Sequence, residues 1–246
     1  MTETKTVSDS MGELEIPADV LYGAQTQRAI NNFPVSGQTL PRAFIKTLLL
    51  IKLVAAETNK KLGCLDADIA DAITLCCESL IADEDLMRHF PIDVFQTGSG
   101  TSSNMNANEV IANLASGKLG REVSPNDHVN FGQSSNDTIP TTIYVSATLE
   151  VRKILVPALE HLISTIEKKS EEVSGVTKTG RTHLMDAMPV SLSQSLDSWA
   201  DQLRNAVSML NSVLPGLYLL AQGGTAVGTG INTHSEFASE FARRLA

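Results

Sequence analysis

Four short polar runs carry residue types that can bind a small anion. Each contains glycine, carries small hydrogen-bonding side chains and lies shortly before an expected helix. A helix start exposes unpaired N–H groups and the positive end of the helix dipole, which together attract a carboxylate. The runs span residues 98–104, 132–138, 180–184 and 223–230.

Capping of the helices is the alternative use of these residues, because Ser, Thr, Asn and Asp satisfy the same N–H groups. Capping alone is the commoner outcome for any single run, whereas four such runs in one chain favour a ligand site. None of the runs has the spacing of a dinucleotide fingerprint or of a P-loop. We therefore expect a site for a small anionic substrate and no cofactor.

His183 is the strongest candidate for proton transfer. It follows Arg181 and Thr182 in a polar stretch just before the longest expected helix. Imidazole suits acid–base chemistry because its ordinary pKa lies near working pH. The five histidines of the chain show no metal-ligand spacing, so we expect no metal site.

The composition narrows the class of protein. The 246 residues suit one large or two small domains, and 42% hydrophobic residues with only 4% aromatics indicate a core of Ala, Leu, Ile and Val, as in helical bundles. A net charge of −9 argues against a nucleic-acid partner. The N-terminus lacks a signal-peptide pattern, and no stretch approaches the roughly 20 apolar residues of a membrane span. We expect no membrane partner.

The three cysteines, Cys64, Cys76 and Cys77, form no CxxC pair. Neither a disulfide framework nor a zinc site is supported, and a reducing compartment fits best. We therefore expect a cytoplasmic protein.

The elements that must position these residues are mostly helical. Residues 1–38 are expected to be irregular with a short hairpin at 11–23, and residues 83–100 and 120–136 to be mostly loop. Helices are indicated by apolar spacing of three and four residues, by Asp66 as a cap and by Gly63 as a stop. They are expected at 41–62, at 66–81, around 107–114, at 138–169 with a kink at Pro157, and after Pro189.

The helix after Pro189 carries an apolar stripe that alternates steps of four and three over almost four heptads. Such a seam predicts lengthwise packing against other helices. The stripe consists of Leu192, Leu196, Trp199, Leu203, Ala206, Leu210, Val213 and Leu217.

A final helix is expected after Thr233 and Glu236, which have capping-box spacing. The chain stops within it at Ala246 and is expected to be a fragment. The fold class is all-α. We expect a small N-terminal helical domain, 1–136, followed by the first long helices of a central bundle, 137–246.

Long ordered motifs resemble class II fumarase, within the fumarase/aspartase superfamily. They are YGAQTQRA, QTGSGTSSNMNANEVIAN, PNDHVNFGQSSNDTIPT, GRTHLMDAMPVSL and GGTAVGTGINTH, and the likeness covers nearly the whole chain. The resemblance implies a carbon–oxygen lyase of the tricarboxylic acid cycle. Such a fumarate hydratase adds water to fumarate reversibly to give malate, through an aci-carboxylate intermediate whose charge hydrogen-bond donors stabilise.

The resemblance also implies roles for individual residues. His183 is the proton donor or acceptor, and Thr182 binds substrate beside it. The other substrate-binding residues are Ser99, Gly100, Thr101, Ser134, Ser135 and Asn136.

A candidate second anion site comprises Arg121, Ser124, Asn126 and Asp127. It departs from the fumarase pattern because Ser124 stands where fumarases often carry a histidine before Pro-Asn-Asp.

Two features favour fumarase over an amine-releasing aspartase. The chain reads Gly-Arg-Thr-His where aspartases typically have glutamine after the threonine. It also reads GGTAVGTG where they typically have GATAIGTG.

The serine loop of the family, GSSxMPxKxNP, is not among these residues. The resemblance implies a homotetramer with sites shared between subunits, so the chain alone is expected to be inactive. Two alternatives stay open: an aspartase-like lyase, or a non-catalytic helical oligomerisation module.

Overall fold

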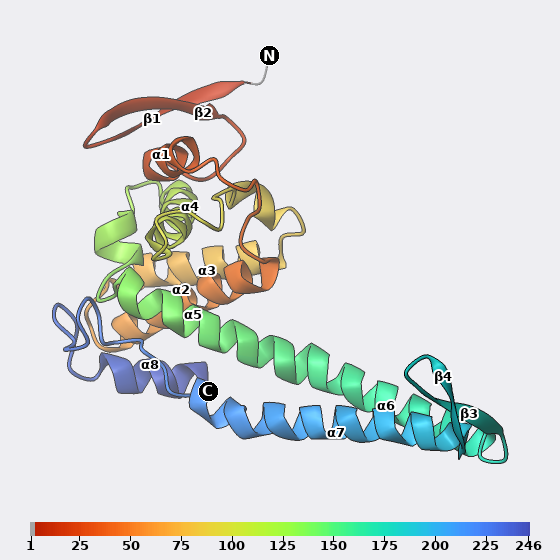
Figure 1. Ribbon diagram of the computed structural model, residues 1–246. Coiled ribbons are helices and arrows are strands. Elements are labelled where there is room, and N and C mark those ends of the chain that lie inside the picture. Colours follow the sequence, from red (N-terminus) through yellow and green to blue (C-terminus); the bar gives the residue numbers. More distant parts are fainter. Residues whose placement is uncertain (1–2) are drawn as a thin grey trace. The chain divides into compact units, whose positions relative to one another are not determined.

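The computed structural model describes residues 3–246, which form two compact units (Figure 1). The first, here called the core unit, runs up to Ser146 and includes Leu220–Ala246. The second, the long-helix unit, is Ala147–Leu219. Helices dominate both units, and each holds one two-stranded antiparallel hairpin. The all-α class is confirmed.

The core unit contains most of the elements, and the last turn of α5 passes into the second unit. In order they are β1 (Thr4–Asp9), β2 (Gly12–Pro17), α1 (Ala24–Asn32), α2 (Arg42–Lys61), α3 (Ala67–Ala82), η1 (Leu86–His89), α4 (Thr101–Leu119), the π-helical turn η2 (Pro125–Val129), α5 (Ser135–Glu150) and α8 (Phe237–Leu245).

The helices α2 and α3 begin and end where local signals place them. Pro41 occupies the N-cap position of α2, and Gly63, with φ +69°, follows its C-cap. Glycine adopts this left-handed conformation without a Cβ penalty, so the helix stops there. Asp66 occupies the predicted N-cap position of α3, but its side chain makes no capping hydrogen bond.

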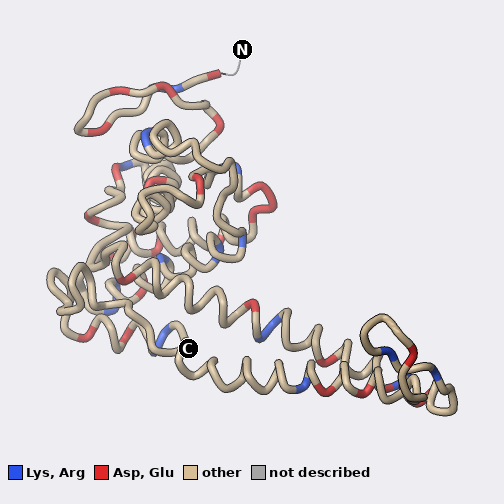
Figure 2. Tube along the Cα trace, viewed as in Figure 1, with Lys and Arg blue, Asp and Glu red and all other residues tan. Residues whose placement is uncertain are grey.

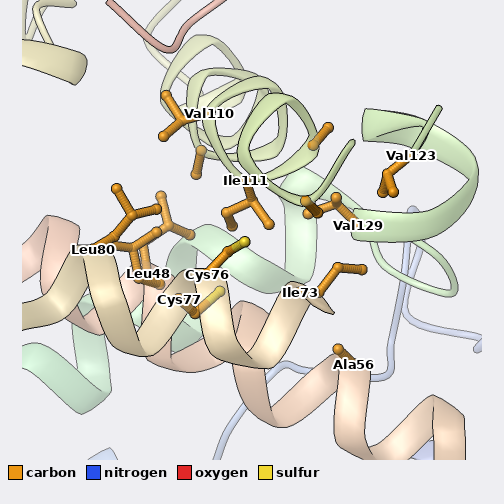
Figure 3. Close-up of a cluster of buried hydrophobic side chains, with 14 of the residues drawn as sticks. Leu48, Ala56, Ile73, Cys76, Cys77, Leu80, Val110, Ile111, Val123 and Val129 are labelled. Atoms are coloured by element: carbon orange, nitrogen blue, oxygen red, sulfur yellow. The ribbon is translucent and has the colours of Figure 1, made fainter. Parts of the chain in front are cut away.

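The main hydrophobic core lies between α2, α3 and α4. Figure 3 shows the side chains of Leu48, Ile73, Cys76, Cys77 and Ile111 gathered between these helices, and all five are 0% exposed. Burial raises the pKa of the Cys77 thiol, so that thiol stays protonated in the core.

A second apolar cluster attaches the C-terminal segment. Phe237 and Phe241 of α8 pack against Ile51, Val54 and Ala55 of α2. Residues 220–246 therefore belong to the core unit, and the units differ from the predicted domains, 1–136 and 137–246, mainly for this reason. The division into an N-terminal domain and a bundle domain stays a prediction for the assembled protein.

The N-terminal segment differs from the expectation of an irregular region. The hairpin pairs Thr4–Asp9 with Gly12–Pro17, so it begins before the expected span 11–23. It is followed by α1, which the sequence did not predict.

The long-helix unit is built on an antiparallel pair, α6 (Val156–Glu172) and α7 (Leu192–Leu217), joined by the strands β3 (Thr177–Thr182) and β4 (Met185–Ser191). Figure 1 shows α6 and α7 side by side. The predicted long α7 is confirmed, while the β3–β4 hairpin was not predicted.

Two local features near the long helices refine the prediction. The kink expected at Pro157 takes the form of a π-helical turn, η3 (Val151–Leu155), because proline has no N–H to continue the preceding hydrogen-bond pattern. The expected capping box of Thr233 and Glu236 is wrong, since α8 begins at Phe237 and Glu236 is its N-cap residue.

No helix among residues 3–246 is long and apolar enough to cross a membrane.

Candidate active site

The first polar run forms the start of α4. Gly100 is the N-cap residue with φ +75°, and a Cβ there would lie 2.8 Å from Cγ2 of Ile139 in α5. Glycine is therefore needed both for the backbone conformation and for close approach of the two helix starts. Ser99 and Thr101 are exposed, with their hydroxyl oxygens 3.0 Å apart.

The second run forms the start of α5. The Ser134 N–H, just before α5, donates to Oδ1 of Asp137 in the first turn of the helix at 2.9 Å. This hydrogen bond fixes the start of α5. The side-chain Nδ2 of Asn104, in α4, donates to Ser135 Oγ at 3.0 Å. The first and second runs are therefore joined by a side-chain hydrogen bond as well as by the Gly100 contact.

The fourth run lies against the second through the buried carboxylate of Asp137. Its Oδ2 accepts hydrogen bonds from the N–H groups of Gly223 at 3.0 Å and Thr225 at 2.8 Å. Asn136 Nδ2 donates to the carbonyl oxygen of Ala226 at 2.7 Å. Three of the four polar runs thus meet within the core unit, and this gathers hydroxyl, amide and N–H groups near two helix starts.

The third run lies in the long-helix unit, at the tip of the β3–β4 hairpin. Thr182 pairs with Met185, so His183 and Leu184 form a two-residue turn with φ values of +47° and +63°. Such turns normally use Asn-Gly, because other residues are strained at positive φ. His183 is exposed at this tip. Strain of this kind clusters at functional positions and favours a role for the turn.

The residues of the candidate second anion site are engaged with protein groups. Arg121 Nη2 lies 2.6 Å from Oδ2 of Asp68, and this hydrogen bond lowers the pKa of Asp68. Ser124 Oγ accepts from the N–H of Asp127 at 3.0 Å, and Asn126 is exposed in the same π-helical turn. An anion would have to displace Asp68 from Arg121, and the assignment stays a prediction.

Two buried residues, Lys52 and Asp137, were not singled out from the sequence. Lys52 Nζ donates to Asn130 Oδ1 at 2.8 Å, just before the second run, and to Gln133 Oε1 at 3.1 Å, within that run. Asp137 joins the second and fourth runs. A signal existed for Lys52, because it lies seven residues after Ile45, on the apolar face of α2.

Comparison with known proteins decides the family. The lyase family matches residues 12–246. The chain belongs to the lyase family.

Two curated relatives carry the name of class II fumarate hydratase. Fumarate hydratase class II 2 of Pseudomonas aeruginosa is 62% identical over 245 residues, which cover 100% of this chain and 53% of that protein. The class II fumarate hydratase of Thermus aquaticus is 50% identical over 99% of this chain and 54% of its own length. This lyase-family chain spans about half the length of the curated relatives it matches. The resemblance to class II fumarase is confirmed.

Solved lyase-family structures share the fold. Class II fumarase from Schistosoma mansoni has a TM-score of 0.91 and 42% identity, covering 99% of this chain and 52% of that one. The fumarate lyase:delta crystallin of Brucella melitensis, bound to cobalt, has a TM-score of 0.90 and 41% identity, covering 99% and 54%. Within residues 3–246 of the present chain, no three His, Cys, Asp or Glu side chains cluster as metal ligands would.

Proposed function

We propose that the protein containing this chain is a fumarate hydratase, a cytoplasmic enzyme of the tricarboxylic acid cycle that interconverts fumarate and malate. The observation that carries the proposal is the likeness to a class II fumarate hydratase, 62% identical across this entire chain. The meeting of three polar runs in the core unit supports a small dicarboxylate as substrate, since hydroxyl, amide and N–H donors suit carboxylate oxygens.

The proposed roles follow the chemistry of each group. Ser99, Gly100 and Thr101 lie at the start of the 19-residue helix α4, where the helix dipole favours a carboxylate. Ser134, Ser135 and Asn136 lie at the start of α5 and offer further donors. These groups would also stabilise the extra negative charge of an aci-carboxylate intermediate, because donors aimed at developing charge lower the barrier.

Thr182 and His183 are proposed to complete the reaction at the hairpin tip. Thr182 would bind substrate and His183 would donate or accept the proton, either directly or through a bound water. Exposure of the His183 ring leaves it free to meet a substrate. The serine loop of the resemblance, GSSxMPxKxNP, is not among the 246 residues, so we expect residues 1–246 alone to show no appreciable turnover.

A homo-oligomer, a tetramer in this proposal, would cover apolar side chains that the long-helix unit leaves open. Trp199 and Val213 of the α7 stripe are 57% and 59% exposed. Figure 2 shows no charged residue along the C-terminal half of α7, and residues 205–217 contain none. An uncharged apolar helix surface of this kind is typical of a subunit interface.

The full-length protein should be assayed with malate, fumarate and aspartate side by side. Fumarate formation and consumption are followed by ultraviolet absorbance, and ammonia release by a coupled assay. We expect turnover of fumarate and malate without ammonia release. Ammonia release from aspartate would instead identify an aspartase-like lyase, and an oligomer inert toward all three substrates would identify an oligomerisation module.

A further inference from the structure

A network of partly buried hydrogen bonds links Lys52 to Ser135. Lys52 is 0% exposed, and its Nζ donates to Asn130 Oδ1 at 2.8 Å. The same Oδ1 accepts from Asn104 Nδ2 at 3.2 Å, and Asn104 Nδ2 also donates to Ser135 Oγ at 3.0 Å. Three polar side chains, from α2, from the loop before α5 and from α4, thus follow one another in this network. Only the last of them, Asn104, contacts the Ser135 hydroxyl of the second polar run.

The ammonium group determines which atom donates and which accepts in each hydrogen bond of this network. A lysine ammonium can only donate, so the amide of Asn130 must present its oxygen to Lys52. Asn104 must then present its NH2 group to that oxygen, because two amide oxygens would repel each other. The two hydrogens of this NH2 group are used on Asn130 and on Ser135.

The Ser135 hydroxyl therefore keeps its own hydrogen available for donation. A serine hydroxyl offers one donor and accepts through its lone pairs, and here the oxygen accepts from Asn104. Its own hydrogen therefore points away from Asn104. An O–H that is free to donate is what a carboxylate oxygen requires, since a carboxylate can only accept.

We propose that Lys52 and Asn104 are positioning residues that fix Ser135 as a hydrogen-bond donor to the substrate carboxylate, which rests on the fumarate hydratase function proposed above. Neither positioning residue touches the substrate. Lys52 acts through Asn130 and Asn104, and Asn104 acts directly on the Ser135 oxygen. The buried lysine accordingly contributes to binding rather than to the proton-transfer step.

The setting of Lys52 fits this role. Burial lowers the pKa of its ammonium to about 7, while the negative charge of Asp137 in α5 opposes that shift. A cation in a dry interior is costly unless other groups compensate. Its amide partners, Asn130 just before the second polar run and Gln133 within it, supply that compensation.

The test reverses the donor and the acceptor of the hydrogen bond between residue 104 and Ser135 in the full-length enzyme. In Asn104→Asp, the carboxylate can only accept, so it captures the Ser135 hydrogen. We expect the KM for fumarate to rise about tenfold with kcat changed by less than about threefold, because a bond to a charged substrate is lost in both ground and transition states. Asn104→Leu removes the donor without adding an acceptor and should raise KM less. It replaces Asn104→Asp as the test variant if the buried carboxylate prevents folding.

Matched variants separate positioning from damage to the fold. Asn108→Asp places a carboxylate one turn further along α4, at another fully buried asparagine, and should leave the KM unchanged. Lys52→Met removes the ammonium but keeps an unbranched side chain, and should raise KM as Asn104→Leu does. Circular dichroism and thermal melting confirm that each variant is folded.

The deciding readout is a double-mutant cycle with Ser135→Ala. If Lys52 and Asn104 act through the Ser135 hydroxyl, their substitutions should add little to the KM of Ser135→Ala. Independent, multiplying effects in that background would overturn the proposal, as would an unchanged KM in folded Asn104→Asp. Absence of fumarate turnover in the wild-type enzyme would instead refute the proposed function, and this inference with it.

Discussion

At the scale of single residues, Glu109 holds the start of α1 from its place in the middle of α4. Its carboxylate accepts hydrogen bonds from the N–H groups of Gly23, Gln25 and Thr26 at 2.9–3.1 Å, and from the Thr26 hydroxyl at 2.6 Å. The first turn of α1 is thus capped by a residue more than 80 positions away. Sequence reasoning missed α1 because its cap is not local.

Glu109→Gln should lower the free energy of unfolding by about 1–3 kcal/mol, because the amide nitrogen places a donor against N–H groups that need an acceptor. Urea unfolding followed by circular dichroism measures the change. Glu78→Gln, at an exposed position of α3, is the matched control and should change stability little. Equal stability of the two variants would contradict the capping role of Glu109.

Asp93 gives a prediction about pH. Hydrogen bonds from the N–H groups of Phe95, Ser36 and Gly37 lower the pKa of its carboxyl from 3.8 to about 2, against the opposing effect of desolvation. A carboxyl with a lowered pKa in the folded state stabilises the fold above pH 3.8, and this contribution is lost as the pH falls toward 2.

Stability of the wild-type chain should therefore fall between about pH 4 and pH 2. In Asp93→Asn the fall should be shallower, because the titrating group is gone. Unfolding curves measured at steps of pH test this, with Asp85→Asn at an exposed position as control. An identical pH profile for wild type and Asp93→Asn would count against the assignment.

At the scale of elements, the sequence predicted best where structure is locally determined. The helices α2, α3 and α7 follow from apolar spacing together with Pro41, Gly63 and Asp66. The β3–β4 hairpin was missed because its turn residues, His183 and Leu184, are not the residues that favour positive φ. Its pairing is also not visible as an alternating apolar pattern.

The start of α7 offers a test at this scale. Ser191 and Gln194 form a reciprocal capping box, in which Ser191 N–H donates to Gln194 Oε1 at 2.9 Å. Ser191→Ala should destabilise the long-helix unit by about 1 kcal/mol, since a helix N–H loses its acceptor.

The single tryptophan, Trp199, lies on α7, so its fluorescence reports unfolding of this unit. Ser198→Ala, at an exposed interior position of the same helix, is the control and should leave the midpoint nearly unchanged. A midpoint for Ser191→Ala equal to that of the control would refute the capping contribution.

At the scale of the whole molecule, the site was predicted in parts. The four polar runs could be recognised because each combines glycine with donors before a helix. The sequence could not show that Asp137 ties the second run to the fourth, because that contact joins residues 86 or more positions apart. Nor could it assign Lys52 a role, since a lysine on an apolar face gives no hint of its partners.

Assembly is the whole-molecule property most open to test. In the full-length protein, Val213→Glu should convert the oligomer to smaller species, because it buries a carboxylate in an apolar contact. Sedimentation velocity measures the distribution. Asn211→Glu, which points about 200° away around the same helix, is the control and should leave the oligomer intact. Retention of the oligomer in Val213→Glu would exclude this stripe as an interface.

The central claim, that this chain supplies the proton-transfer residue of a fumarate hydratase, is tested most directly by His183→Asn in the full-length enzyme. Asparagine tolerates the positive φ of the turn, +47°, so the hairpin should survive while the acid–base group is lost. We predict that fumarate hydration, measured by ultraviolet absorbance at saturating substrate, falls at least about 100-fold with the oligomer and melting temperature unchanged. Turnover near that of the wild type would contradict the account.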